Sequence, residues 1–489
     1  MEESNESTSQ PLIVQQSSSS REEEEKFGKK LWVEIKKQWH IVGPAIFSRV
    51  ASFTMNVVIQ VFAGHLGDLE LAAVSIANTV IVGFNFGLLL GMASALETLC
   101  GQAFGAKRLD MLGVYLQRSW IVLIGCCFIL LPLYVWAGSI LKAIGYSDAV
   151  AEETELVARW LIPLHFSFAF QFPLQRFLQS QLKTQVIAWV SLLALIVDVF
   201  LSWLLVYVIP LGVVGLALAL DASWWVLFFG LFVYTVGGWC RDTWTGFSWE
   251  ALSGLWEFLT LSAASGVMLC LENWYYRILV LMVGYLENPT IAVDALSICM
   301  TINGWEVMIP LAFLAATGVR VANELGAGNG KGAKFATIIS VSQSVVIGLV
   351  VFMVILILHD KYGLLFTTSS SVLKATDSLS YLLAFAMLLN SVQPVLSGVA
   401  IGSGWQAWVA YINLGCYYII GLPLGIVMGW VVHLGVKGIW GGMLVGGTLL
   451  QTIILAIIVA RSDWEKEVEK ARARVNKWSK PLPEDTVET

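Results

Sequence analysis

Charged side chains are scarce in this chain. Only 13% of its 489 residues are charged and 57% are hydrophobic, whereas a soluble globular domain has about 25% charged and 45–50% apolar residues. This balance excludes an ordinary soluble domain and predicts an all-α membrane protein. The formal net charge is −6, and no basic patch with interleaved aromatic residues is present, so we expect no nucleic acid as a partner.

The residue patterns of common enzyme chemistries are also missing. The seven cysteines are odd in number and lie mostly within apolar runs, and the five histidines are scattered. This predicts free buried thiols and gives no metal-ligand spacing. The chain contains no P-loop, nucleophile elbow or histidine box. We therefore expect neither an enzyme nor a bound metal or cofactor.

Long apolar stretches are abundant instead. A helix that crosses a bilayer needs about 20 mainly apolar residues, and about twelve stretches of this chain satisfy that length. Their approximate centres are Thr54, Gly83, Phe128, Leu161, Leu195, Trp225, Glu272, Asn303, Gly348, Leu388, Tyr418 and Gly447. The sequence thus predicts twelve transmembrane helices.

Loop composition divides the chain and orients it. We predict a cytosolic tail (1–38), an N-lobe of six helices (39–236), a cytosolic linker (237–257), a C-lobe of six helices (258–460) and a cytosolic tail (461–489). If both termini are cytosolic, the inner loops carry more Lys and Arg than the outer loops, as the positive-inside rule requires. The inner set is Lys107, Arg108, Arg118, Arg176, Lys183, Arg241, Arg320, Lys331 and Lys334; the outer set is Lys142, Lys361, Lys374 and Lys437.

The first tail has two parts. Residues up to Arg21 are polar and predicted to be disordered. From Phe27 to Trp39, apolar residues recur at helical spacing with lysines between them. This pattern fits an amphipathic helix on an anionic membrane surface, and fits equally well a solvated start of the first span.

The two halves resemble each other at an offset of about 221 residues, a symmetry typical of transporters. Gly105-Ala106-Lys107 matches Gly326-Ala327-Gly328, and Pro173 matches Pro394. Leu211–Gly215 matches Leu434–Gly438 in the same way. Because each half has six spans, the repeat is parallel. We therefore predict two bundles related by a pseudo-two-fold axis along the membrane normal.

Carboxyl groups lie inside several predicted spans. Glu272 is near the middle of the apolar run Leu259–Met282, where a charged side chain costs roughly 2.5 kcal/mol or more, so such residues usually serve a function. Burial disfavours the charged form, which suits a proton carrier. The alternative is a structural ion pair with Arg277.

Two further acids are candidates for proton binding. Glu306 is near mid-span, and Pro310 four positions later is expected to kink the helix beside it. Asp198, with Ser202 nearby, is the deepest acid of the first half, and a structural hydrogen-bonded role is equally consistent with its position. We therefore predict proton coupling by Glu272, Glu306 and Asp198.

Polar and aromatic residues near these acids define a candidate solute cavity. Structural contacts between helices explain such polar residues equally well. The predicted set is Asn390, Gln393, Tyr276, Trp274, Trp305, Tyr417 and Arg277.

Four segments resemble a known family. ETLCGQAFGAKR from Glu97, RVANELGAGNGKGAK from Arg320, LENWYY around Glu272 and the stretch from Gln393 to Gly425 are similar to motifs of plant multidrug and toxic compound extrusion (MATE) transporters, the DETOXIFICATION group. The resemblance implies six plus six helices and cation-coupled efflux, with protons usual in plants. It places the family's seventh-span glutamate on Glu272. Plant relatives often pair that residue with an aspartate, and here the corresponding position is Asn390.

The resemblance also sets the functional expectation. The version with Asn390 is similar to a subgroup linked to flavonoid transport into vacuoles. We expect a monomeric, proton-coupled antiporter that moves organic solutes such as flavonoids or xenobiotics across the vacuolar membrane, with the plasma membrane as the alternative. Its partners would be the solute, protons and membrane lipid. A gated anion channel on the same fold is the alternative function, with Arg277 and Arg49 supplying the positive field.

Overall fold

The computed structural model describes residues 12–286 and 289–478, and every regular element within them is helical. The helices of the first half are α1 (Leu12–Leu66), α2 (Asp68–Ile76), η1 (Ala77–Val82), α3 (Gly83–Gly105), η2 (Leu109–Met111), α4 (Leu112–Val135), α5 (Ala137–Ile144), α6 (Asp148–Trp160), α7 (Ile162–Ser180), α8 (Thr184–Trp203), η3 (Leu204–Val208), α9 (Gly212–Tyr234) and η4 (Thr235–Trp239).

A short linker with η5 (Trp249–Leu252) leads to the second half. Its helices are α10 (Leu255–Val283), α11 (Pro289–Glu306), α12 (Met308–Gly326), α13 (Gly330–Ile357), η6 (Tyr362–Leu365), α14 (Ser370–Ser403), α15 (Gln406–Asn413), η7 (Leu414–Gly421), α16 (Leu422–Ile426), η8 (Val427–Val431), α17 (Gly435–Met443), η9 (Leu444–Leu449), α18 (Leu450–Arg461) and α19 (Trp464–Trp478).

Eleven helical segments of the described chain are long and apolar enough to cross a membrane, by length and composition alone. The twelfth predicted span, centred on Leu161, is divided between α6 and α7, which meet at that residue. Pro163 lies at the start of α7, a position where the absence of a proline N–H costs little. Asp221 of α9 accepts a hydrogen bond from the backbone N–H of Leu164 at 2.9 Å. The break within this span is therefore capped by a neighbouring helix.

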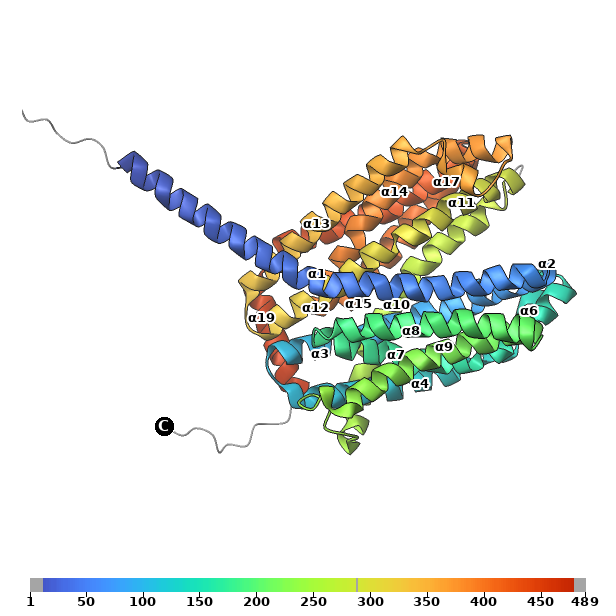
Figure 1. Cartoon of the computed structure of the whole chain (residues 1–489). Coiled ribbons are helices and arrows are strands. Elements are labelled where there is room, and N and C mark those ends of the chain that lie inside the picture. The colour runs from blue at the N-terminus through green and yellow to red at the C-terminus, as the bar shows by residue number, and fades with distance from the viewer. Residues whose placement is uncertain (1–11, 287–288, 479–489) are drawn as a thin grey trace, which may run out of the picture.

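The helices form two bundles, as the sequence predicts (Figure 1). The bundles lie close together at the end of the molecule that carries α19, which we call the joined end. They separate toward the end that carries α2, α6, α11 and α17, which we call the divergent end (Figure 1). We call the first-half bundle the N-lobe and the second-half bundle the C-lobe.

The predicted repeat is visible at the joined end. Gly105 ends α3 and Gly326 ends α12. A Cβ atom on Gly105 would overlap the carbonyl oxygen of Asn323, and one on Gly326 would overlap that of Gln102. Gln102 and Asn323 are themselves separated by the repeat offset. The two lobes thus meet through a symmetric pair of glycines, each packed on the other lobe's backbone.

A row of glycines along α3 lets α10 approach closely. A Cβ atom on Gly87 would lie 3.2 Å from Asn273 Nδ2, and one on Gly91 would lie 2.9 Å from the Cα atom of Gly266. Small residues at such spacing allow close helix packing within membranes. Helix α10 therefore packs against the N-lobe with part of its length while belonging to the C-lobe in sequence.

Two expectations about the cytosolic ends are wrong. Helix α1 already begins at Leu12, so part of the segment predicted to be disordered is helical, and residues 1–11 lie outside the described residues. Arg176, expected in a loop, lies inside α7 with its side chain only 3% exposed. The charge of Arg176 is neutralised by a buried carboxylate and not by water, and loop counting does not detect this.

The amphipathic start of α1 is continuous with the first span. Glu34 is buried and accepts hydrogen bonds from Arg320 of the C-lobe at 2.9 and 3.0 Å. Phe27 and Trp32 remain exposed, at 58% and 68%. Phe27 touches the ring of Phe335 at 6.3 Å between centroids, so one face of this segment is bound to protein while much of its aromatic surface stays exposed, which is compatible with a membrane surface.

Replacing Gly91 with alanine should weaken the packing of α3 on α10. The added methyl group meets backbone atoms of Ser265 and Gly266 at 2.9 Å, which cannot rotate away, and overpacking of this kind costs about 1–3 kcal/mol. We expect a lower melting temperature of the purified protein in detergent. Gly125→Ala is the matched control, because nothing lies within 4 Å of a Cβ atom there; equal melting temperatures for both variants would contradict the proposed contact.

Candidate functional site

Glu272 and Glu306 both belong to the C-lobe. Glu272 lies on α10, and Glu306 is the last residue of α11. The helix breaks at Val307 before α12 begins, which confirms the expected effect of Pro310, because proline has no N–H to bond the carbonyl four residues earlier. The kink places Glu306 at a discontinuity in the backbone.

A polar network connects the surroundings of the two acids. The hydroxyl of Tyr276 donates to Asn390 Oδ1 at 3.0 Å and lies 3.2 Å from the hydroxyl of Thr448. Asn390 Nδ2 in turn donates to Asn303 Oδ1 at 3.0 Å. Tyr276 interacts electrostatically with both carboxyl groups. Four segments, α10, α11, α14 and η9, thus meet around Tyr276.

Each acid has one partner and one free oxygen. Ser391 Oγ lies 3.4 Å from Glu306 Oε1, and Gln393 is within hydrogen-bonding reach of Glu272. The second oxygens, Glu272 Oε2 and Glu306 Oε2, are buried and have no hydrogen-bond partner. A buried oxygen of this kind can take up a proton without breaking an existing bond.

Tyr417 lies on a second chain of hydrogen bonds in the same lobe. Its hydroxyl donates to Gln451, whose Nε2 donates to Asn413 Oδ1 at 2.6 Å. Its ring stacks on Tyr275 with centroids 4.5 Å apart. Because Tyr417 is fully buried, it supports the walls around Glu272 and has no surface of its own to offer a solute.

The remaining predicted residues face the other lobe. Trp274 contacts Phe84 of α3 and Trp305 contacts Phe53 of α1, with ring centroids 5.6 and 4.8 Å apart. Both tryptophans are 41% exposed. Aromatic side chains of the C-lobe are therefore accessible where the two lobes meet.

Arg277 does not pair with Glu272. No ion pair in the described part of the chain joins them, and the Arg277 guanidinium lies over Gly83 of α3, 2.8 Å from a Cβ atom built there. Side chains three or four positions apart share a helix face, whereas these two are separated by five. The alternative of a structural ion pair for Glu272 is therefore wrong.

Asp198 lies apart from this network, on α8 of the N-lobe. It is fully buried, and both carboxyl oxygens lack a hydrogen-bond partner. Ser223 is nearby but donates its hydroxyl hydrogen to the carbonyl of Ala219 at 2.7 Å. The structure thus separates Asp198 from the other predicted site residues.

Our sequence analysis did not identify a buried ion pair within the N-lobe, between α3 and α7, that lies against the C-lobe. Arg176 Nη1 lies 2.8 Å from Glu97 Oε2, and the two side chains are 3% and 0% exposed. The carboxyl group of Glu97 touches Gly318 of α12 so closely that a Cβ atom there would overlap it. Glu97 opens the first family motif, but its partner is 79 positions away in the printed sequence and only folding brings them together.

Next to this pair, direct hydrogen bonds close the joined end. Thr98 Oγ1 donates to the carbonyl of Ile401 at 2.5 Å, and Gln102 Nε2 donates to that of Gly402 at 3.0 Å. Gln406 Nε2 adds a bond to Thr98 Oγ1 at 2.7 Å. These bonds join α3 of the N-lobe to α14 and α15 of the C-lobe, and they must break before the joined end can open.

Helix α19 packs over the joined end and contacts both lobes. Trp464, Val468 and Ala471 pack it onto the C-lobe, while Arg474 Nη1 donates to Gln102 Oε1 of the N-lobe at 2.8 Å. Both terminal nitrogens of Arg474 also lie 3.4 Å from the carbonyl oxygen of Ser403. Burial lowers the pKa of the Arg474 side chain. Arg474 therefore interacts with one residue from each lobe.

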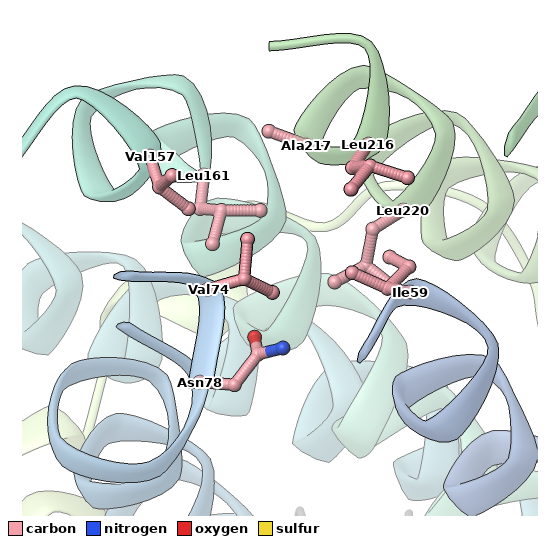
Figure 2. Close-up of a pocket in the computed structure, with 8 residues that line it drawn as sticks. All are labelled: Ile59, Val74, Asn78, Val157, Leu161, Leu216, Ala217 and Leu220. Atoms are coloured by element: carbon pink, nitrogen blue, oxygen red, sulfur yellow. The ribbon is translucent and has the colours of Figure 1, made fainter. Parts of the chain in front are cut away.

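A small cavity occupies a different place, inside the N-lobe (Figure 2). It has a volume of about 10 Å³ and is lined by apolar side chains and Asn78, whose two side-chain polar atoms have no partner. Such a volume holds about one water molecule, and no predicted solute residue lines it. This cavity is too small for an organic solute.

Two repeated bundles that join at one end, with carboxyl groups buried inside them, form the architecture of a membrane transporter. Comparisons with known proteins give its family. The family model MatE matches residues 44–204 and 264–427. Protein DETOXIFICATION 27 of Arabidopsis thaliana is 64% identical over 453 residues, 93% of each chain, and Protein DETOXIFICATION 28 of the same plant is 61% identical over 451 residues, 92% of each chain.

The crystal structure of the eukaryotic MATE transporter AtDTX14 superposes with a TM-score of 0.85 at 35% identity, covering 91% of this chain and 99% of that one. The chain therefore belongs to the MATE family, which confirms the resemblance seen in its motifs. Members of this family are multidrug and toxin efflux antiporters and not enzymes.

Replacing Arg474 with glutamine should loosen the joined end. A hydrogen bond from a charged group contributes about 1.5–3 kcal/mol, so its loss raises the population of open molecules by about tenfold or more. We would introduce Ser180→Cys, beside the closure, and follow its labelling by a membrane-impermeant maleimide added from the α19 side. Arg472→Gln is the control, since Arg472 is exposed on the same helix. Equal labelling rates in both variants would show that Arg474 does not stabilise the closed state of the joined end.

Proposed function

We propose that this MATE transporter is a proton-coupled antiporter that exports organic solutes by alternating access of its two lobes. The observation that carries the proposal is the pair of carboxyl groups, Glu272 and Glu306, each with one buried oxygen that has no partner, beside the Tyr276 network. Intramembrane acids at a lobe face are suited to bind and release protons. Helix α10, which carries Glu272, contacts both lobes and is therefore placed to transmit such a change.

The cycle follows from the two ends of the molecule. With the cytosol on the α19 side, this structure is closed toward the cytosol by the α3–α14 bonds. Protonation of Glu272 from the opposite, acidic side turns its carboxylate from a hydrogen-bond acceptor into a donor, which changes the hydrogen bonds offered to the solute and favours its release there. Opening of the joined end then exposes the site to the cytosol, where loss of the proton prepares it for another solute.

The solute is proposed to be a flat aromatic compound such as a flavonoid or a xenobiotic. Support comes from Trp274 and Trp305, which are partly exposed between the lobes beside the acids. Ring systems stack favourably on such side chains at centroid separations of about 4.5–7 Å. Asn390, Gln393 and Tyr276 would supply hydrogen bonds, and Asp198 a second proton site in the N-lobe. The vacuolar membrane is the proposed location.

Glu272→Gln should abolish solute uptake driven by a pH gradient in proteoliposomes. The amide keeps the shape of the carboxyl group but cannot exchange a proton. Glu469→Gln serves as the matched control, because Glu469 is exposed on α19. Gradient-driven uptake by the Glu272 variant at the wild-type rate would refute the coupling role.

Asn390→Asp should make uptake depend more steeply on pH. The new side chain can still accept from Tyr276, but only its protonated form can donate to Asn303 Oδ1. A second titrating group would then act beside Glu272, and the slope of uptake rate against proton concentration should rise toward about two. Asn476→Asp on the exposed face of α19 controls for added charge. An unchanged slope would place Asn390 outside the coupling site.

A further inference from the structure

Arg49 is a guanidinium group without a partner in the interior of the molecule. It lies on α1, within the first membrane span. Among the residues that the structure describes, it makes no ion pair and no hydrogen bond, although it is partly buried. A guanidinium stays charged in proteins, and an unpaired charge away from bulk water is costly. Binding of an anion would neutralise this charge.

The neighbouring residues do not supply that anion. Arg49 interacts electrostatically with Glu97 and with Arg176. Glu97 is already committed to Arg176, at 2.8 Å. Two guanidinium groups therefore share one carboxylate, which leaves a surplus of one positive charge.

The position of Arg49 on α1 brings this surplus close to the contact between the lobes. Residues four apart lie on one helix face, so Arg49 shares its face with Phe53, whose ring contacts Trp305 of the C-lobe. Glu97, the carboxylate with which Arg49 interacts electrostatically, touches α12 directly. Thr98, next in sequence, begins the set of bonds that close the joined end. The residues that Arg49 shares its face and its electrostatic field with, Phe53 and Glu97, therefore both contact the C-lobe.

We propose that Arg49 is an anion-binding site that receives the carboxylate or sulfate group of an organic solute, or a free halide ion. The inference rests on the proposed function in that the solute reaches Arg49 from the space between the lobes. A guanidinium binds a carboxylate through two parallel hydrogen bonds. The aromatic body of such a solute would then lie against Phe53 and Trp305, toward the acids of the C-lobe.

The test is equilibrium binding of radiolabelled 2-naphthoate to the purified full-length protein, without a pH gradient. The wild type should bind naphthoate at least about tenfold more tightly than its neutral methyl ester, and Arg49→Gln should lose at least about tenfold in affinity for naphthoate alone. Arg49→Lys should keep part of the preference because it keeps the charge. Arg159→Gln is the control, since Arg159 is exposed and paired with Glu155.

Two arms complete the experiment. Displacement of naphthoate by chloride would show that the site accepts a free halide, and failure of chloride to displace it would assign the site to organic anions. In case the Arg49 variants do not fold, naphthoate should slow the modification of Arg49 by phenylglyoxal in the wild type, followed by mass spectrometry, without protecting Arg159.

The proposed site would be refuted if the wild type bound naphthoate and its ester equally well. It would also be refuted if naphthoate did not slow the modification of Arg49 by phenylglyoxal. Because binding is measured at equilibrium, loss of proton-driven transport would count against the antiport mechanism and not against Arg49. Conversely, intact proton-driven uptake of a neutral solute together with no anion binding would refute only this inference.

Discussion

The close approach of α3 to the C-lobe is the contact on which the arrangement depends. Gly87 and Gly91 bring α10 against α3, and Gly105 packs on the backbone of α12. Only residues without a Cβ atom allow helix backbones to come this near, and in lipid such packing replaces the hydrophobic effect as the source of association. The same helix carries Glu97, Thr98 and Gln102, so the joining surface and the closure are parts of one element.

Two groups of polar side chains lie inside this protein, where lipid cannot reach them: one at the joining region and one in the C-lobe interior. Around Tyr276 they form a connected network that holds two carboxyl groups at a lobe face. Around Arg176 they form a buried ion pair within the N-lobe, next to the hydrogen bonds that close the joined end. The proposed proton exchange and the closure therefore involve different polar groups, and α10 and α12 provide the physical link between them.

Much of the architecture follows from sequence pattern alone. The twelve spans, the parallel repeat and the kink after Glu306 are confirmed, because apolar length, an offset of about 221 and a mid-span proline are local signals. The pairing of Glu272 with Arg277 is wrong because residues five positions apart do not share a helix face. The loop position of Arg176 is wrong because its partner, Glu97, is distant in the sequence. Asp198 is predicted as a proton site because it lies deep in an apolar run. Its separation in space from Glu272 and Glu306 cannot be seen in the sequence.

The sequence by itself determined that the chain spans a membrane, that its halves are copies, and that a few acids are hidden in apolar runs, since the cost of burying charge in lipid applies to any fold. Tertiary structure decided which polar groups meet. Glu97 pairs with Arg176, and Arg49 is left without a counter-ion. Tyr276 is hydrogen-bonded to Asn390, and Arg474 bonds to residues of both lobes. Those choices depend on which helix faces turn toward each other, and that is settled only when the glycine-lined surfaces pack.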